Sequence, residues 1–221
     1  MDTSNTMNVS NGSVSVSEEP QKERIVSLAS SRFFQEGFSK ITLDELASEL
    51  AMSKKTLYKF FANKEDLLNT VVDRLMMEAR QRLSSIMGSQ KSFVEKLSEI
   101  LTFLGQLVRR VSKPFQRDLQ LHAPEVWTRV EEFRRLRITE VFGRLIDQGI
   151  DEGYIRRDIN RRVFFLSYLG AIENVVRPAV LTNESFSGHE AIEAIIRMFF
   201  EGILTTEGRQ ELLQQDQIHH G

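Results

Sequence analysis

The residues best suited to bind another molecule through charge lie in a short segment between Glu49 and Glu65. This segment holds four lysines and no acidic residue, although the whole chain has a formal net charge of −2. Lysine pairs with phosphates or donates to guanine edges, and threonine and tyrosine hydroxyls reach phosphate oxygens. These residue types and spacings indicate DNA recognition. The candidate contact residues are Lys54, Lys55, Thr56, Tyr58 and Lys59.

Two short helices must position these side chains. Thr42 and Glu45 form a capping-box pattern, which predicts that a helix begins there and continues with an apolar face to about Leu50. Residues 51–53 leave room only for a tight turn, and Ser53 is a suitable N-cap for a second helix over 54–61. This spacing is typical of a helix-turn-helix, whose second helix enters the major groove by its N-terminal end.

The segment resembles the DNA-binding signature of the TetR family of bacterial transcriptional regulators. It departs from that signature at two positions: Ala51 stands where the turn residue is often glycine, and Phe60 stands at the aromatic or histidine position, where it lacks a possible donor to phosphate. A left-handed alanine would be strained, but other turn geometries are available. The matching residues are Gly37, Phe38, Ile41, Thr42, Leu46, Ala47, Met52, Ser53, Thr56, Leu57, Tyr58, Phe61, Lys64, Glu65 and Leu67.

The resemblance implies further properties that the residues alone do not establish. Thr42, Ser53 and Lys64 are expected to hold phosphates, and Phe60 lies among the DNA-contacting positions. From sequence alone, Lys64 is equally well a solvated surface lysine. The resemblance also implies an effector cavity in the second domain and a homodimer that binds a double-stranded DNA operator.

Composition favours an all-α protein. The 221 residues include only four prolines and twelve glycines, 41% of the residues are hydrophobic, and alternating β-branched segments are almost absent. We expect a disordered tail over 1–19, a three-helix DNA-binding domain over 20–67, a ligand-binding and dimerisation domain over 68–206, and a polar tail over 207–221. The second domain should be a helical bundle.

The last two long helices of this bundle, over about 161–181 and 188–203, carry apolar residues on more than one face. A second apolar face indicates a partner, and the resemblance implies that these two helices pair with the same helices of another subunit. The alternative is that both helices are simply central in the core of a monomer.

Aromatic residues are abundant in the second domain, and helical bundles bind small molecules in mostly apolar cavities with a few polar groups. An aromatic at helical spacing is equally compatible with ordinary core packing. The cluster of Arg134, Arg135 and Arg137 is interpreted as a solvated face. The pocket candidates are Phe103, Phe115, His122, Trp127, Phe133, Phe165, Tyr168, Glu173 and Asn174.

Several classes of function are excluded by what the sequence lacks. There is no cysteine, the four histidines lack metal-ligand spacing, and no phosphate loop, dinucleotide fingerprint or nucleophile elbow is present. We therefore predict no enzyme, metal site or cofactor. No apolar run approaches the roughly 20 residues of a membrane span, and residues 1–20 do not resemble a signal peptide, so a cytoplasmic location is expected.

Together these features predict a dimeric transcriptional regulator of a palindromic operator, most simply a repressor released when a small molecule binds the second domain. Two alternatives stay open. The protein could activate transcription, or a protein partner rather than a small ligand could control it.

Overall fold

The computed structural model describes residues 19–175, 180, 184–186 and 188–219, and every regular element among them is a helix. The predicted all-α class is therefore confirmed for this part of the chain. The tail predicted over 1–19 lies outside it, apart from Glu19, which begins the first helix. The helices are α1 (Glu19–Glu36), α2 (Leu43–Glu49), α3 (Lys54–Phe60), α4 (Lys64–Gly88), α5 (Phe93–Arg110), α6 (Lys113–His122), α7 (Pro124–Asp151), α8 (Arg161–Val175), α10 (Gly188–Ile203) and α11 (Thr206–His219).

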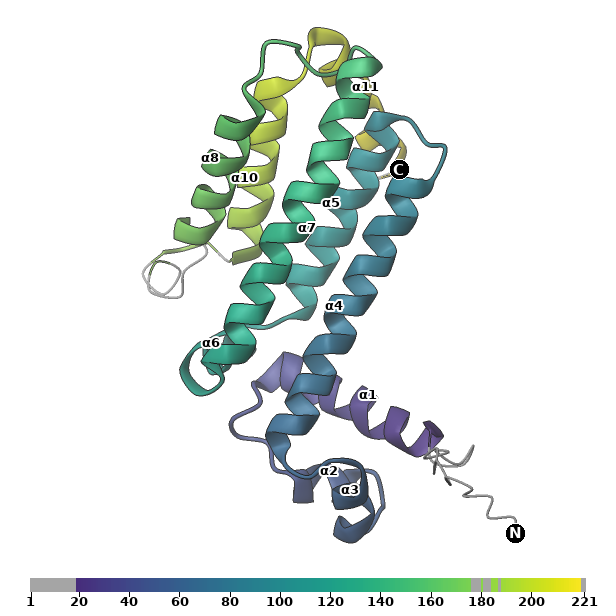
Figure 1. The fold of residues 1–221 in the computed structure, drawn as a ribbon, viewed down its shortest axis with the longest axis vertical. Coiled ribbons are helices and arrows are strands. Elements are labelled where there is room, and N and C mark those ends of the chain that lie inside the picture. Colours follow the sequence, from purple (N-terminus) through teal and green to yellow (C-terminus); the bar gives the residue numbers. More distant parts are fainter. Residues whose placement is uncertain (1–18, 176–179, 181–183, 187, 220–221) are drawn as a thin grey trace, which may run out of the picture.

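The molecule is elongated, with a small N-terminal head at one end of a helical bundle (Figure 1). The head consists of α1, α2, α3 and the start of α4. Helix α4 runs from the head along the bundle, where it packs against α5 and α7, while α8 and α10 lie side by side on one flank. A single helix thus belongs to both parts of the molecule.

Side-chain caps set the starts of the head helices at the predicted residues. The Thr42 hydroxyl accepts a hydrogen bond from the Glu45 N–H at 3.2 Å, and the Glu45 carboxylate accepts one from the Thr42 N–H at 2.7 Å. This second bond holds the pKa of Glu45 below its ordinary value. Ser53 caps α3 and Asn63 caps α4 in the same way. The predicted capping box and the predicted N-cap at Ser53 are confirmed.

The turn between α2 and α3 contains a strained residue. Ala51 has a φ of 53°, so it adopts the left-handed conformation rather than one of the other geometries open to alanine. The backbone forces this choice, because the Met52 N–H donates to Ala47 O and the Ala51 N–H donates to Ser48 O, both at 3.0 Å. This hydrogen-bonding pattern ends α2 as a glycine would.

Replacing Ala51 with glycine is therefore expected to stabilise the protein. Left-handed alanine costs about 1–2 kcal/mol, and the greater freedom of unfolded glycine returns about 0.5–1 kcal/mol of that. We expect a net gain of about 0.5–1 kcal/mol in the free energy of unfolding, measured by urea denaturation. Ser48→Gly, an exposed change within α2, is the matched control and should destabilise the protein. An Ala51→Gly variant no more stable than the parent would contradict the strain.

The core of the head extends beyond the predicted boundary at residue 67. It includes the first two turns of α4 and also α6, whose Phe115 ring lies 5.1 Å from that of Phe34. Asp118 of α6 accepts a hydrogen bond from the Ser39 N–H at 2.8 Å and lies where a side chain on Gly37 would fall. Helix α6 therefore docks on the loop between α1 and α2.

The segment predicted as a polar tail over 207–221 instead contains helix α11, which packs against α5. Thr205 begins it by accepting a hydrogen bond from the Gly208 N–H at 3.1 Å. Gly208 fits closely, since a Cβ there would lie 2.4 Å from Tyr154 O, and Leu212 packs against the bundle core. Its apolar contacts are too few to give the periodic pattern by which the other helices were recognised.

Candidate nucleic-acid interface and cavity

Helix α3 buries one face and exposes the other. Leu57 is fully buried in the core of the head, and Phe61, directly after the helix, is 1% exposed. The opposite face presents Lys54, Lys55, Tyr58 and Lys59 to solvent. Tyr58 is 49% exposed. An exposed aromatic ring between lysines is suited to contact a ligand rather than to stabilise the head.

Lys54 also links α3 to α2. Its Nζ donates to Asp44 Oδ2 at 2.5 Å, and this hydrogen bond raises the pKa of Lys54 above its ordinary value. Part of its charge is thus compensated within the head. Lys55 lies next to it on the exposed face without an acidic neighbour in α3.

The hydroxyl candidates have structural roles in the head. The Thr42 hydroxyl takes part in the capping box, and Ser53 Oγ accepts from the Thr56 N–H at 3.0 Å. Thr56 Oγ1 lies 2.8 Å from Ser53 Oγ and shares a hydrogen with it. Each hydroxyl oxygen keeps further bonding capacity, so the predicted phosphate contacts of these residues stay predictions.

Phe60 and Lys64 are less exposed than the sequence suggested. The Phe60 ring packs partly buried against the core of the head. Lys64 is half-buried, and its Nζ donates to Phe38 O at 3.1 Å and to Ser39 O at 2.9 Å. Lys64 therefore holds α4 to the loop between α1 and α2, and one of its three N–H donors is left for a phosphate.

A second feature is a cavity of about 190 Å³ inside the bundle. It lies between α4, α5, α7, α8 and α10, and its walls are mainly aliphatic. Leu75, Met76 and Ala79 of α4 form one wall, and Leu104 and Leu107 of α5 adjoin them. Apolar cavities of roughly 150 Å³ are large enough to bind benzene, so this space can hold a small apolar ligand.

Of the nine pocket candidates, Phe133 and Tyr168 line this cavity. The other seven do not, because packing or solvent exposure places them elsewhere. Phe115 and Trp127 pack in or against the core of the head, and Phe103 and Phe165 pack at the edge of the bundle core. His122 and Asn174 are exposed. Glu173 forms an ion pair with Arg135 at 2.8 Å. The prediction that these seven residues line the pocket is therefore wrong for this cavity.

Two arginines that were interpreted as a solvated face do line the cavity. Arg134 and Arg137 lie one turn apart on α7, with side chains 30% and 26% exposed. Only Arg135, whose side chain is 63% exposed, fits the solvated interpretation. One sequence feature could have predicted this placement. Arg134 and Arg137 are three residues apart and lie next to the apolar residues Phe133, Ile138 and Val141, which also line the cavity.

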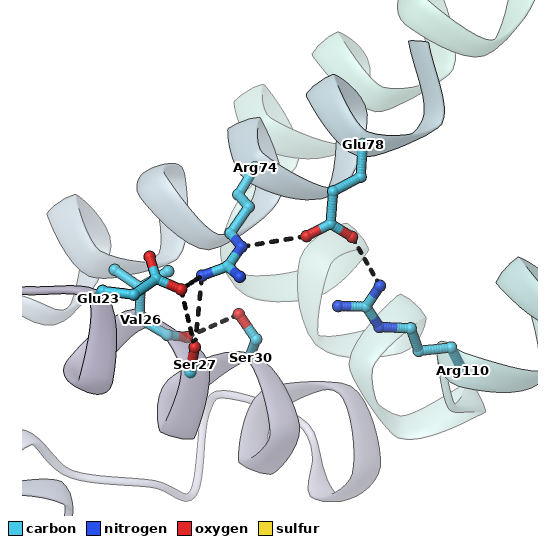
Figure 2. Close-up of polar contacts among 7 residues, drawn as sticks. All are labelled: Glu23, Val26, Ser27, Ser30, Arg74, Glu78 and Arg110. Carbon is cyan, nitrogen blue, oxygen red and sulfur yellow. Dashed lines mark hydrogen bonds and ion pairs between the residues drawn. The ribbon is translucent and has the colours of Figure 1, made fainter. Parts of the chain in front are cut away.

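A polar network connects the head to the bundle (Figure 2). Arg74 of α4 donates to Glu23 of α1 at 2.5 Å and to Glu78 at 3.1 Å. Glu78 accepts a further hydrogen bond from Arg110 of α5 at 2.8 Å. Burial and these two arginines act on Glu78 in opposite directions, and its pKa is lowered. The network alternates along α4 with the residues that line the cavity.

The part of the chain that the structure describes offers neither a metal-binding cluster nor a membrane-spanning helix. Within residues 19–175, 180, 184–186 and 188–219, no His, Cys, Asp and Glu side chains gather in a group of three that could hold a metal ion. None of the helices in the same part of the chain combines the length and apolar character needed to span a membrane.

Similarity to known proteins covers both the head and the bundle. The sequence profile of the bacterial regulatory proteins of the tetR family matches residues 25–71. An uncharacterised HTH-type transcriptional regulator of Bacillus subtilis, YvaF, is 28% identical over 174 residues, which span 78% of this chain and 90% of that protein. A transcriptional regulator from Cytophaga hutchinsonii has a similar structure, with a TM-score of 0.67, 22% identity, and coverage of 84% of this chain and 99% of that one.

The structure of SmeT, the repressor of a multidrug efflux pump of Stenotrophomonas maltophilia, is also similar. Its TM-score is 0.61 at 17% identity, and the match covers 84% of this chain and 91% of that one. The similarity to both structures therefore extends through the bundle and is not confined to the head.

Proposed function

Because the chain belongs to the TetR family of bacterial transcriptional regulators and is a DNA-binding regulator rather than an enzyme, we propose that it is a ligand-released repressor. The observation that carries this proposal is the cavity of about 190 Å³, which lies directly against the helix that begins in the head. The similarity to SmeT, which is a repressor, supports the direction of control.

The exposed face of α3 is proposed to lie in the major groove of the operator. Lys55, Tyr58 and Lys59 face solvent and are the main candidates for contacts with bases and phosphates. Lys54 adds a charge shared with Asp44. Phosphate contacts at the edge of this face are proposed for Thr42, Ser53, Thr56 and Lys64. Phe60, whose ring packs against the core of the head, is proposed to support α3.

A homodimer is proposed to form through α8 and α10. Exposed Val163 and Leu166 and half-buried Gly170 share one stripe of α8, at spacings of three and four residues. Met198 and Gly202 continue an equivalent stripe on α10. A Cβ added to either glycine would meet nothing within 4 Å, so both positions leave room for another helix to approach closely.

Effector binding is proposed to act through α4. A ligand in the cavity contacts Leu75, Met76 and Ala79, while Arg74 and Glu78 of the same helix join α1 and α5. Displacement of α4 would therefore move the head and change the spacing of the two recognition helices in the dimer. The effector releases DNA only if it binds the displaced arrangement of the dimer more tightly than the arrangement that fits the operator.

Filling the cavity covalently tests this mechanism without a known effector. Ala79 is 4% exposed and lines the cavity, so Ala79→Phe places a ring where the ligand would lie. We expect operator affinity to fall about 5-fold to 150-fold, the usual range of coupling between two sites. Fluorescence anisotropy of labelled operator DNA measures the change.

Ser84→Phe is the matched control, because it adds the same ring to the exposed side of α4. It should bind the operator like the parent protein. If Ala79→Phe stays folded and dimeric, as judged by circular dichroism and sedimentation, and binds the operator as tightly as the parent, the proposed coupling is wrong.

The alternatives of activation and of control by a protein partner make different demands on the molecule. A protein partner requires a docking surface and no cavity, so the apolar cavity favours a small ligand. Activation would require tighter operator binding in the ligand-bound state. Because its DNA target lies in the bacterial cytoplasm, we propose that the protein acts there.

A further inference from the structure

The cavity inside the bundle presents apolar surface alone to a molecule that enters it. Its walls, within the described part of the chain, consist of Leu, Ile, Val, Ala, Met and Phe side chains together with Arg134, Arg137 and Tyr168. None of these last three residues places nitrogen or oxygen surface in the cavity. Because a polar group that is buried without a hydrogen-bond partner costs free energy, such walls favour a ligand without polar groups.

Both arginines contribute hydrocarbon to the wall, since their charged ends are engaged elsewhere. Arg134 Nη2 lies 2.7 Å from Glu131 Oε1, and Arg137 Nη1 lies 2.5 Å from Glu140 Oε2. The Arg137 guanidinium also lies over the Phe133 ring, 6.0 Å from its centre. Arginine can bury its methylene stem along apolar surface in this way while its charge is compensated outside.

The buried polar atoms beside the cavity favour neither sign of ligand charge. Two buried side-chain atoms lack a hydrogen bond within the described residues: Glu131 Oε1, which is an acceptor, and Arg137 Nε, which is a donor. A charged ligand would be attracted by one of these groups and repelled by the other. The two carboxylates and two guanidinium groups already compensate each other along α7.

Aromatic rings form part of the wall, and the ring of Tyr168 is uncharged. The residue is 1% exposed, and burial raises the pKa of its phenol, so the proton stays bound at neutral pH. The centres of the Tyr168 and Phe142 rings lie 5.6 Å apart, edge to face, and both rings line the cavity together with Phe133. Met76 adds a thioether. Aromatic rings and thioethers both make favourable contacts with a further aromatic ring.

The volume of the cavity limits the size of its ligand. At about 190 Å³ it is somewhat larger than the apolar cavities of roughly 150 Å³ that bind benzene. A single ring would therefore leave room for a short alkyl chain.

We propose that the cavity binds an uncharged, apolar molecule with about the bulk of a benzene ring carrying a short alkyl chain. The inference rests on the proposed function, in which this cavity holds the effector, and it names the chemical class of that effector. A carboxylate or ammonium group would lose its hydration here without gaining a partner, because the charged groups of α7 are already paired.

Four probes that share a phenylethyl group test this ligand class. They end in a methyl, hydroxyl, carboxylate or ammonium group: propylbenzene, 2-phenylethanol, 3-phenylpropanoate and 2-phenylethylammonium. Binding to the full-length protein is measured by isothermal titration calorimetry in sealed cells, below the solubility limit of propylbenzene. We expect propylbenzene to bind most tightly, the alcohol at least about ten-fold more weakly, and both ions at least about 100-fold more weakly.

The affinities of the four probes decide the proposal. A polar probe that binds as tightly as propylbenzene would overturn it, and so would the absence of propylbenzene binding up to its solubility limit.

Cavity-filling variants show whether propylbenzene occupies this space. Ala79→Phe adds a ring from α4, and Val108→Phe adds one from α5, since both residues line the cavity. We expect each variant that stays folded by circular dichroism to lose propylbenzene binding. Ser84→Phe, on the exposed side of α4, is the control and should bind like the parent. Binding that survives in both cavity variants would place the ligand elsewhere and overturn the proposal.

Operator release distinguishes failure of this inference from failure of the proposed function. If 3-phenylpropanoate or 2-phenylethylammonium, rather than propylbenzene, binds in the cavity and releases the operator, the cavity is an effector site and only the apolar ligand class is wrong. If propylbenzene binds with the expected preference but leaves operator affinity unchanged, the ligand class stands and the repressor mechanism fails.

Discussion

Removing two lysines from the exposed face of α3 is expected to abolish most operator binding without disturbing the fold. Lys55 and Lys59 are exposed, and the stability of the helix depends instead on buried Leu57 and the Ser53 cap. Each specific base contact is worth roughly 1–3 kcal/mol, and a dimer makes every such contact twice. We therefore expect the Lys55→Ala/Lys59→Ala variant to bind at least about 100-fold more weakly in an anisotropy titration.

The salt dependence of this variant reports which groups the lysines bind. The slope of log affinity against log salt should become shallower by roughly 0.9 for every phosphate that the variant no longer neutralises. The Lys91→Ala/Arg209→Ala variant removes the same two charges near the far end of the bundle, and we expect its binding to match the parent. Near-parental affinity of the α3 variant, with an unchanged slope, would exclude this face from the DNA interface.

A charge on the exposed stripe of α8 is expected to produce a folded monomer that no longer holds its operator. Leu166 is 64% exposed and lies between Val163 and Gly170, so glutamate at this position costs the isolated chain little. In a dimer the same carboxylate would be buried without a partner. Because linked binding sites gain roughly 10²–10⁴ in affinity, Leu166→Glu should weaken operator binding by about that factor.

Sedimentation velocity and thermal melting separate assembly from folding in this experiment. Leu121→Glu is the control, because Leu121 is 60% exposed but lies on α6, away from α8 and α10. This control should stay dimeric. A Leu166→Glu variant that sediments as a dimer at micromolar concentration would place the subunit interface elsewhere.

The sequence predicted the head well because its structure depends on local interactions. The capping box at Thr42 and the N-cap at Ser53 are both read from spacings of three residues. Ala51 shows the limit of such reasoning. Its left-handed conformation is imposed by the hydrogen bonds that Ala51 and Met52 donate to the last turn of α2, and its own side chain opposes it.

The cavity was predicted less well because it depends on how five distant helices meet. Amino-acid type marks Phe115 and Trp127 as plausible pocket residues, yet both belong to the head side of the molecule. Conversely, Leu75 and Ala79 look like ordinary core positions of α4, and Arg137 looks like a surface charge. Helix α11 was missed because few of its residues reach the core.

The central claim is that two copies of this chain recognise a two-fold symmetric DNA sequence through α3. In vitro selection of random double-stranded DNA by the full-length protein, at about 0.15 M salt, tests it most directly. We expect enrichment of a palindrome whose half-sites lie one helical turn, about 34–36 Å, or a multiple of it apart. Absence of any enriched symmetric site, with protein shown to be folded and dimeric, would contradict the claim.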